Sequence, residues 1–264
     1  MRIETRGPER GICNLCGKEA KLTEDHIPPK QVPRVGQSEL MHLIDYMQVE
    51  PANQSKQTRR FFQRGVKFRS ICGHCNNERL GARYDPELIS FTHQIAGALH
   101  QRLFLPIDAD VRINRLARSV VGHQLAHGLG THRRGEVIDQ LTDYFLDESV
   151  PFPANLHFYC WLYPYNDQVV ANAAVGYFDF AVHQHPVFFL LQKYFPVGFL
   201  ITQGELPPTA YEIVQLDTAL DGNIDAPARV RLPLNIPPPH RWPEAPGENG
   251  AIMHTQGASA ARRR

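Results

Sequence analysis

The stretch LTEDHIPPK, residues 22–30, places a carboxylate and an imidazole side by side at Asp25 and His26. An aspartate supplies a hard oxygen ligand for Mg²⁺ or Mn²⁺, and a histidine can take a proton from water near neutral pH. Adjacent residues of a strand point to opposite faces, so both can serve one site only if the backbone bends. Ile27-Pro28-Pro29 favours such a turn. The pair is therefore a candidate for metal-assisted hydrolysis; the alternative is an Asp-His pair that only forms hydrogen bonds.

Four of the five cysteines form two C-x-x-C pairs, Cys13 with Cys16 and Cys72 with Cys75. Such pairs in a chain without an export signal favour zinc over disulfides. Four thiolates close the coordination sphere, so the expected zinc is structural and a catalytic centre must lie elsewhere. The alternative is four reduced structural cysteines. The fifth, Cys160, is expected to be an ordinary buried residue.

Two asparagines, Asn76 and Asn77, follow the second cysteine pair directly in CGHCNNERLG. The carbonyl oxygen of an asparagine is another hard metal ligand. A zinc ion that ties Cys16 to Cys75 would also bring the Asp25-His26 segment near Asn76. Residues far apart in the sequence are therefore expected to share one site.

Together, the blocks CNLCG, LTEDHIPPK and CGHCNNERLG resemble the HNH endonuclease family, in its subgroup with a C-x-x-C zinc staple. The resemblance covers about residues 10–84, and three separate blocks agree in order. It implies a ββα fold around one divalent metal, Mg²⁺ or Mn²⁺. It further implies Asp25 as a metal ligand, His26 as the general base and Asn76 as the second metal ligand.

The chain departs from the family pattern in one place. The family carries a middle asparagine shortly before the second cysteine pair, where this chain reads RGVKFRSIC. Asn53 and Asn77 are the candidates to replace it. The departure leaves open which residue orients the loop that carries His26.

A basic segment, residues 56–69, places six Lys and Arg around three phenylalanines. Basic side chains suit phosphate contacts and phenylalanines can stack on bases, so Arg59, Arg60 and Lys67 are predicted to bind nucleic acid. Arg79, on the expected helix after Asn76, is a further candidate for phosphate contact. The alternative is that the phenylalanines enter the core and the charges face water.

Charge is distributed unevenly along the chain. Residues 1–84 hold 15 Lys and Arg against 9 Asp and Glu, whereas the remainder holds 13 against 18. A basic half indicates a polyanionic partner, which we expect to be DNA. No secretory signal and no apolar run long enough to span a bilayer are present, so we expect a cytoplasmic protein with no membrane partner.

The expected fold class is α+β. A zinc-stapled ββα-metal module, residues 1–84, is followed at 85–235 by an α+β domain with N-terminal helices and an antiparallel sheet. Residues 236–264 are rich in Pro, Gly and Ala and are expected to form a disordered tail.

Local patterns predict the elements of the second domain. Three helices are predicted within 85–105, 111–129 and 135–148, the first with Asp85 as its N-cap and Pro86 at its first position. Four strands are predicted in LHFYCWLYPY, QVVANAAVGYFDFAVH, VFFLLQKY and VGFLITQ, which are rich in aromatic and β-branched residues.

Three histidines in HQLAHGLGTH, His123, His127 and His132, are spaced somewhat like those of a zinc protease. Gln124 stands where such an enzyme has its glutamate base. This segment is therefore predicted to carry surface histidines of a helix.

Two functions remain open from the sequence. The first is a metal-dependent HNH endonuclease that cuts phosphodiester bonds, in a phage-defence or mobile-element setting. The second is a non-catalytic zinc-ribbon module that binds nucleic acid or protein. Residues 85–235 are candidates for binding a protein partner or an activating ligand.

Overall fold

The computed structural model of this chain describes residues 3–48, 60–101, 106–178, 185–206, 211–220, 222–234, 241–245 and 249–263. Helices and antiparallel sheets are combined in it, so the α+β prediction is confirmed. Among the described residues, no helix combines the length and the apolar character needed to cross a membrane.

The N-terminal region holds a small antiparallel sheet of β1 (Arg10–Ile12), β2 (Glu19–His26) and β5 (Lys67–Cys72). β2 pairs with β5 so that Asp25 lies opposite Phe68. A π-helical segment, η2 (His74–Tyr84), follows β5 and runs directly into the helix α2 (Asp85–His100).

The larger sheet has nine strands, in the order β11-β7-β10-β9-β8-β14-β3-β4 with β13 also paired to β8. Their bounds are β3 Ser38–His42, β4 Arg60–Phe62, β7 Leu156–Leu162, β8 Gln168–Tyr177, β9 Val187–Tyr194, β10 Val197–Gln203, β11 Val214–Gln215, β13 Ala251–His254 and β14 Ser259–Arg263. The four strands predicted from sequence, β7 to β10, are confirmed.

The remaining elements are α1 (Leu43–Gln48), α3 (Ile113–Ala126), α4 (Glu136–Leu146), the short helix η3 (Asp217–Ala219) and a separate pair of strands, β6 (Ile107–Arg112) with β12 (Pro227–Leu232). α2, α3 and α4 are the three predicted helices. The predicted N-cap at Asp85 is wrong, because η2 continues into α2, the N-cap of α2 is Tyr84 and Asp85 is its first helical residue.

The predicted disordered tail is wrong for its last part. β14 lies between β8 and β3, with Ala260 opposite both Val169 and Met41. Its alanines are small and buried, so a segment of low sequence complexity still fits a central strand position.

The predicted division at residue 84 is also corrected. β3 and β4 belong to the first 84 residues, yet β3 joins β14 in the large sheet. One continuous cluster of buried apolar side chains extends from Ile3 to Ala261. The N-terminal segment therefore contributes to two sheets and shares its core with the rest of the chain.

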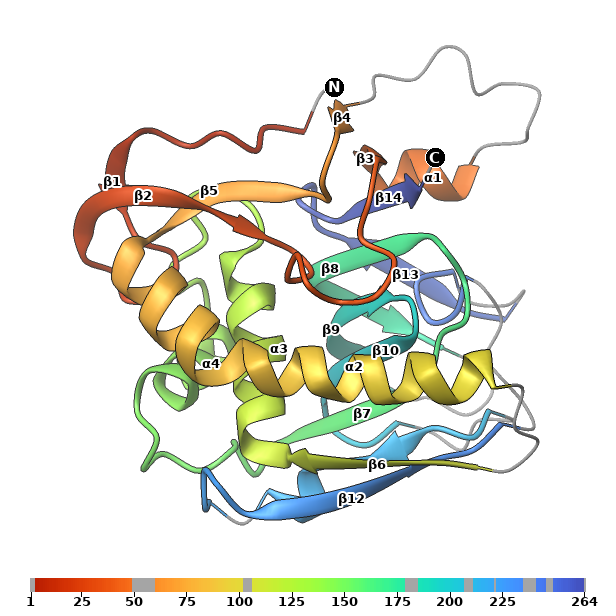
Figure 1. The fold of residues 1–264 in the computed structure, drawn as a ribbon. Coiled ribbons are helices and arrows are strands. Elements are labelled where there is room, and N and C mark those ends of the chain that lie inside the picture. The colour runs from red at the N-terminus through yellow and green to blue at the C-terminus, as the bar shows by residue number, and fades with distance from the viewer. Residues whose placement is uncertain are drawn as a thin grey trace.

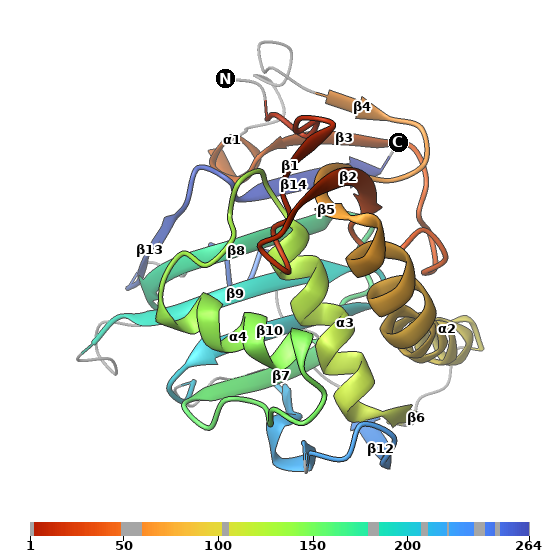
Figure 2. The same cartoon turned by 90° about the vertical axis from the view of Figure 1, so that its left-hand side faces the viewer.

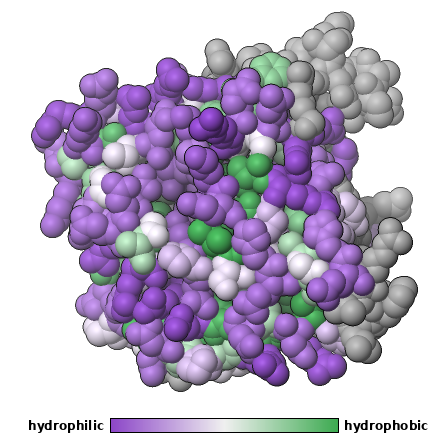
Figure 3. Space-filling view, in the orientation of Figure 1, coloured by the Kyte–Doolittle hydropathy of each residue, from purple (hydrophilic) through white to green (hydrophobic). Residues whose placement is uncertain are grey.

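Helix α3 occupies the centre of this arrangement. Figures 1 and 2 show it between the small sheet of β1, β2 and β5 and one face of the large sheet, with α4 beside it. Almost every residue of α3 is buried, polar ones included. The outer surface in Figure 3 is mainly hydrophilic, with apolar side chains only in small patches.

Candidate functional site

The four paired cysteines meet in space. Their sulfur atoms all lie within 4.8 Å of one another, and the Sγ atoms of Cys16 and Cys72 are 3.8 Å apart. A tetrahedral Zn²⁺ with Zn–S bonds of about 2.3 Å would separate its sulfurs by about 3.8 Å. All are free thiols, and the three other than Cys16 are buried. The cluster therefore fits a metal ion such as zinc. Cys160 is buried and alone, as predicted.

The pKa values of Cys13, Cys16 and Cys75 are shifted in different directions. A hydrogen bond from the Cys75 thiol lowers the pKa of Cys13 to about 4. That shared proton is also the main reason why the pKa of Cys75 is raised. Burial raises the pKa of Cys16. A cation at the centre would replace the shared proton and stabilise all four thiolates together.

The strand β2 sends Asp25 and His26 to opposite sides, as the alternation of side chains along a strand requires. Asp25 is 4% exposed and faces α3, whereas His26 is only partly buried and lines a cleft. β2 ends at His26, so the bend comes too late to bring the two side chains together. Among the described residues, no hydrogen bond links the two side chains or joins them to a common partner.

Asp25 is held by a histidine from α3. The Asp25 carboxylate accepts a hydrogen bond of 3.0 Å from Nδ1 of His123, and Nε2 of His123 donates at 3.0 Å to Asp85. Ser119 also donates to Asp85, at 2.7 Å. Both ring nitrogens of His123 therefore carry protons, so the imidazole is a cation between two carboxylates. Although burial opposes this charge, the two aspartates raise the pKa of His123 to about 10.

The prediction that these histidines lie on the surface of a helix is wrong for His123 and His127, and the half-buried His132 lies in the loop after α3. His123 is fully buried, and His127 is 1% exposed with Nε2 at 2.9 Å from the hydroxyl of Ser259. Burial alone lowers the pKa of His127 to about 3, so it is neutral. The same helix thus buries one charged and one neutral imidazole, and only the charged one has carboxylate partners.

The cleft beside His26 has a volume of about 380 Å³. Its basic lining residues are Arg6, Lys30, Arg60, Arg64 and Lys67, and its acidic residue is Glu24. Lys67 forms an ion pair with Glu24, and Arg6 lies 4.0 Å from the same carboxylate. Burial is the main reason why the pKa of His26 is lowered; the charge of Asp25 opposes this shift, whereas Lys67 and Lys30 act in the same direction as burial. His26 is therefore mostly neutral at pH 7 and faces a positively charged cleft.

The loop after His26 is fixed by hydrogen bonds to other strands. The backbone N–H of Ile27 donates to the carbonyl of Val66 at 3.0 Å, and the Gln168 side chain donates to the carbonyl of Ile27. Gln168 belongs to β8 of the large sheet. This contact holds the backbone directly after His26.

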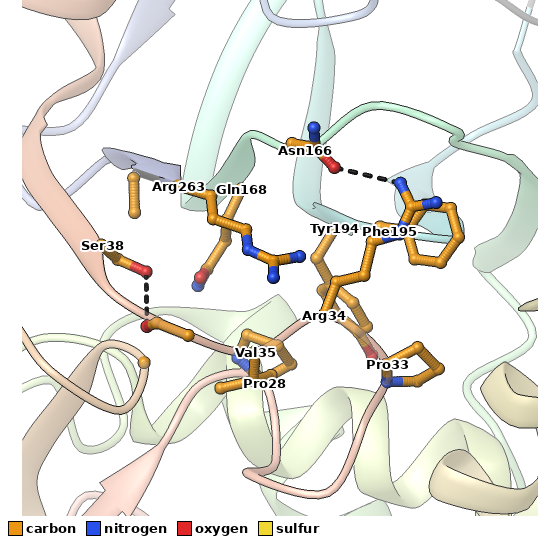
Figure 4. A pocket seen from close by; sticks show the side chains of 13 residues that line it. Pro28, Pro33, Arg34, Val35, Ser38, Asn166, Gln168, Tyr194, Phe195 and Arg263 are labelled. Carbon is orange, nitrogen blue, oxygen red and sulfur yellow. Dashed lines mark hydrogen bonds between the residues drawn. The ribbon is translucent and has the colours of Figure 1, made fainter.

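A second set of contacts also holds the loop after His26. Arg34 donates to Asn166 at 3.1 Å and its guanidinium lies 3.5 Å from the centre of the Phe195 ring (Figure 4). The cavity between these groups measures about 30 Å³, which is the volume of about one water molecule. It is therefore a packing junction that anchors the loop and has no room for a substrate.

The remaining predicted residues lie in different surroundings. Asn76 donates its amide to the Thr23 hydroxyl at 3.0 Å and to the Glu24 carbonyl at 3.1 Å, so it braces β2. Arg79 donates to the carbonyl of Leu146 at the end of α4 and does not line the cleft. Asn77 is exposed. Arg59 and Asn53 lie outside the described residues.

Sequence reasoning missed several residues of this region. Arg6, Lys30 and Arg64 reach the cleft from three separate segments, and only their charge was visible beforehand. The i, i+4 spacing of His123 and His127 marked one face of a helix, but it did not reveal that this face is buried. Nothing in the local sequence singled out Gln168.

Comparisons with known proteins add no assignment: no family model, curated protein or solved structure matches this chain. The function must therefore be inferred from the geometry and from the sequence resemblance.

The cysteine cluster generates the first prediction. Purified protein should contain one Zn²⁺ per chain by mass spectrometry of metals, and Cys72→Ser should lose it and melt at a lower temperature, because structural zinc contributes folding free energy. Cys160→Ser, at a buried cysteine outside the cluster, is the matched control and should keep its zinc. Folded parent protein without metal would contradict the prediction.

The buried histidine generates a second prediction. The folded-state pKa of His123, about 10, lies above the ordinary value of 6.5, so its stabilising contribution is complete below about pH 6.5. That contribution is lost as the pH rises toward 10. Urea unfolding of the parent and of His123→Gln at pH 6, 8 and 10 should show their difference in unfolding free energy shrinking with rising pH. A difference that grows toward pH 10 would show that His123 is not a buried cation.

Proposed function

We propose that this protein is an endonuclease of the HNH type that hydrolyses phosphodiester bonds in DNA, with His26 as its general base. The main supporting observation is the position of His26: a partly buried imidazole of lowered pKa in a cleft with five basic side chains, at the opposite end of the β2–β5 pair from the four-cysteine cluster. The resemblance of the three sequence blocks to the HNH family supplies the reaction.

The cleft offers two things that phosphodiester hydrolysis needs. The neutral ring of His26 can accept a proton from an attacking water at pH 7, because its pKa is below that of free histidine. The cations of Lys30, Arg60 and Arg64 can hold the phosphate and stabilise negative charge as it develops. Glu24 limits this field only in part, because Lys67 already neutralises it.

The catalytic metal implied by the resemblance fits this arrangement poorly. Its two ligands would be Asp25 and Asn76, but Asp25 is buried against His123 on the other side of β2 from the cleft. The amide nitrogen of Asn76 braces β2, so only its carbonyl oxygen would be available to a metal, without the carboxylate of Asp25 beside it. We therefore assign no step of the reaction to Mg²⁺ or Mn²⁺. Cleavage assays in buffer free of both ions, with Mg²⁺ or Mn²⁺ then added back and the zinc content checked in parallel, test the requirement directly.

The burial of Asp25 against His123 favours a second candidate function. A zinc module that only binds nucleic acid needs the basic cleft and the cysteine cluster, and it can use Asp25 purely as a structural anion. The engagement of Asp25 by His123 is what such a module would show. The two candidates differ in what they require of His26: the nuclease needs its imidazole for turnover, whereas the binding module does not.

Plasmid cleavage by the parent and by His26→Ala separates the candidates. The nuclease predicts a loss of at least about 100-fold in rate, because a general base contributes to the transition state. Zinc content and melting temperature should stay close to the parent. Parental cleavage should persist through neutral pH and fall only as the pH drops through the lowered pKa of His26, below 6.5. Equal rates in parent and variant would exclude His26 as the base.

DNA affinity provides a further prediction for the cleft. Lys30→Ala with Arg64→Ala should weaken binding to unrelated DNA sequences and flatten the slope of log affinity against log salt by about one unit per lost phosphate contact. The matched control is Arg229→Ala with Arg231→Ala, which removes the same charge from β12, on the opposite side of the molecule from β2 (Figure 1). Equal effects of both double variants would mean that the cleft does not bind the backbone.

A further inference from the structure

A larger cavity lies apart from the His26 cleft and shares no lining residue with it. Its volume is about 480 Å³. The C-terminal end of α3, the following loop at 128–131, α4, β8 and the turn at 255–257 enclose it. This size falls within the range of about 300–1,000 Å³ that is usual for small-molecule sites.

One wall of the cavity is an irregularity in β8. The pairing of β8 with β9 shifts between Ala171 and Ala174, and the two residues between them, Asn172 and Ala173, line the cavity. Asn172 is fixed there, since it donates to the His127 carbonyl at 3.2 Å and accepts from Thr255. Bulges of this kind often redirect side chains beside functional sites.

A buried polar group in the wall lacks a partner. Gln124 is 2% exposed and lines the cavity, yet its Oε1 makes no hydrogen bond to any described residue. A buried carbonyl oxygen without a donor is unfavourable, so an occupant that carries an N–H group would stabilise this wall.

The charge of the lining is one-sided. The charged residue of the lining is Arg134. Its side chain is exposed and forms no ion pair with the described residues. Its neighbour Arg133, by contrast, is paired with Asp143. No carboxylate of a described residue lines the cavity, whereas Leu125, Leu129 and Ile138 give it an apolar side. An occupant should therefore be anionic at one end and flat and weakly polar at the other.

We propose that this cavity binds a nucleoside monophosphate. A carboxamide such as that of Gln124 can pair with the edge of a base, where a donor and an acceptor lie side by side. The guanidinium of Arg134 matches the geometry of a phosphate. The leucines and Ile138 cover the face of the base. The three features belong to one molecule of suitable size.

The site is joined to the cysteine cluster. Asn14, between the first two cysteines, donates to the carbonyl of Gly128 at 3.1 Å and accepts from the N–H of Thr131 at 3.2 Å. Both partners line the cavity. A ligand that orders this loop should also stabilise the cysteine loop, so it should slow the loss of metal to a chelator.

Isothermal titration of the full chain with AMP, GMP, CMP, UMP and inorganic phosphate tests the proposal. We expect at least one nucleotide to bind at least tenfold more tightly than phosphate alone and to slow zinc loss to EDTA. Arg134→Ala should weaken it about tenfold, as expected for one lost charged contact. Arg133→Ala, the matched control outside the cavity, should bind as the parent does.

Gln124→Leu should weaken the preferred base and reduce the preference among the four nucleotides. Because Gln124 is buried, the binding result for this variant counts only if its melting curve matches that of the parent. The Arg134→Ala variant provides an independent test, since Arg134 is exposed. Absence of nucleotide binding at millimolar concentration, binding no tighter than that of phosphate, or equal losses in Arg133→Ala and Arg134→Ala would overturn the proposal. None of these readouts depends on DNA cleavage, so the outcome is separate from that of the nuclease assay.

Discussion

The structure depends on one buried cation between two carboxylates. His123 joins Asp25 of β2 to Asp85 at the start of α2, and it does so from α3, the helix that packs between the two sheets. An isolated buried charge is costly, so all three groups must be present together for any of them to be tolerated. This requirement fixes the small sheet, α2 and α3 relative to one another, and it turns Asp25 away from the His26 cleft.

Two other sets of contacts hold β2 and the loop that follows it. The cysteine cluster joins the loop before β2 to the end of β5. Gln168 of the large sheet holds the carbonyl of Ile27, directly after His26. The imidazole is thus positioned by groups from both sheets, on a strand end that has little freedom to move. A general base needs such fixed placement, because its contribution depends on its distance from the reacting water.

The basic cleft and the larger cavity lie on separate parts of the molecule but share neighbours. Gln124, in the cavity wall, follows His123 directly in α3, and Asn14 links the cavity loop to the cysteines. Any occupant of the cavity therefore contacts elements that also hold β2.

The sequence by itself determined several of the helices and strands and the cysteine cluster. The spacing of apolar residues predicted α2, α3 and α4, and the β-branched and aromatic runs predicted β7 to β10, because these patterns arise from each element's own geometry. The two C-x-x-C pairs predicted the cysteine cluster, since two such pairs in one chain are typical of a shared metal site. Only the tertiary structure decided that His123 is buried against Asp25, 98 residues away, that Gln168 anchors the His26 loop, and that β14 completes a sheet. Those contacts join segments that are far apart in the chain, and the local sequence of one segment does not indicate its partner. The contacts are therefore set by packing and charge in the folded chain.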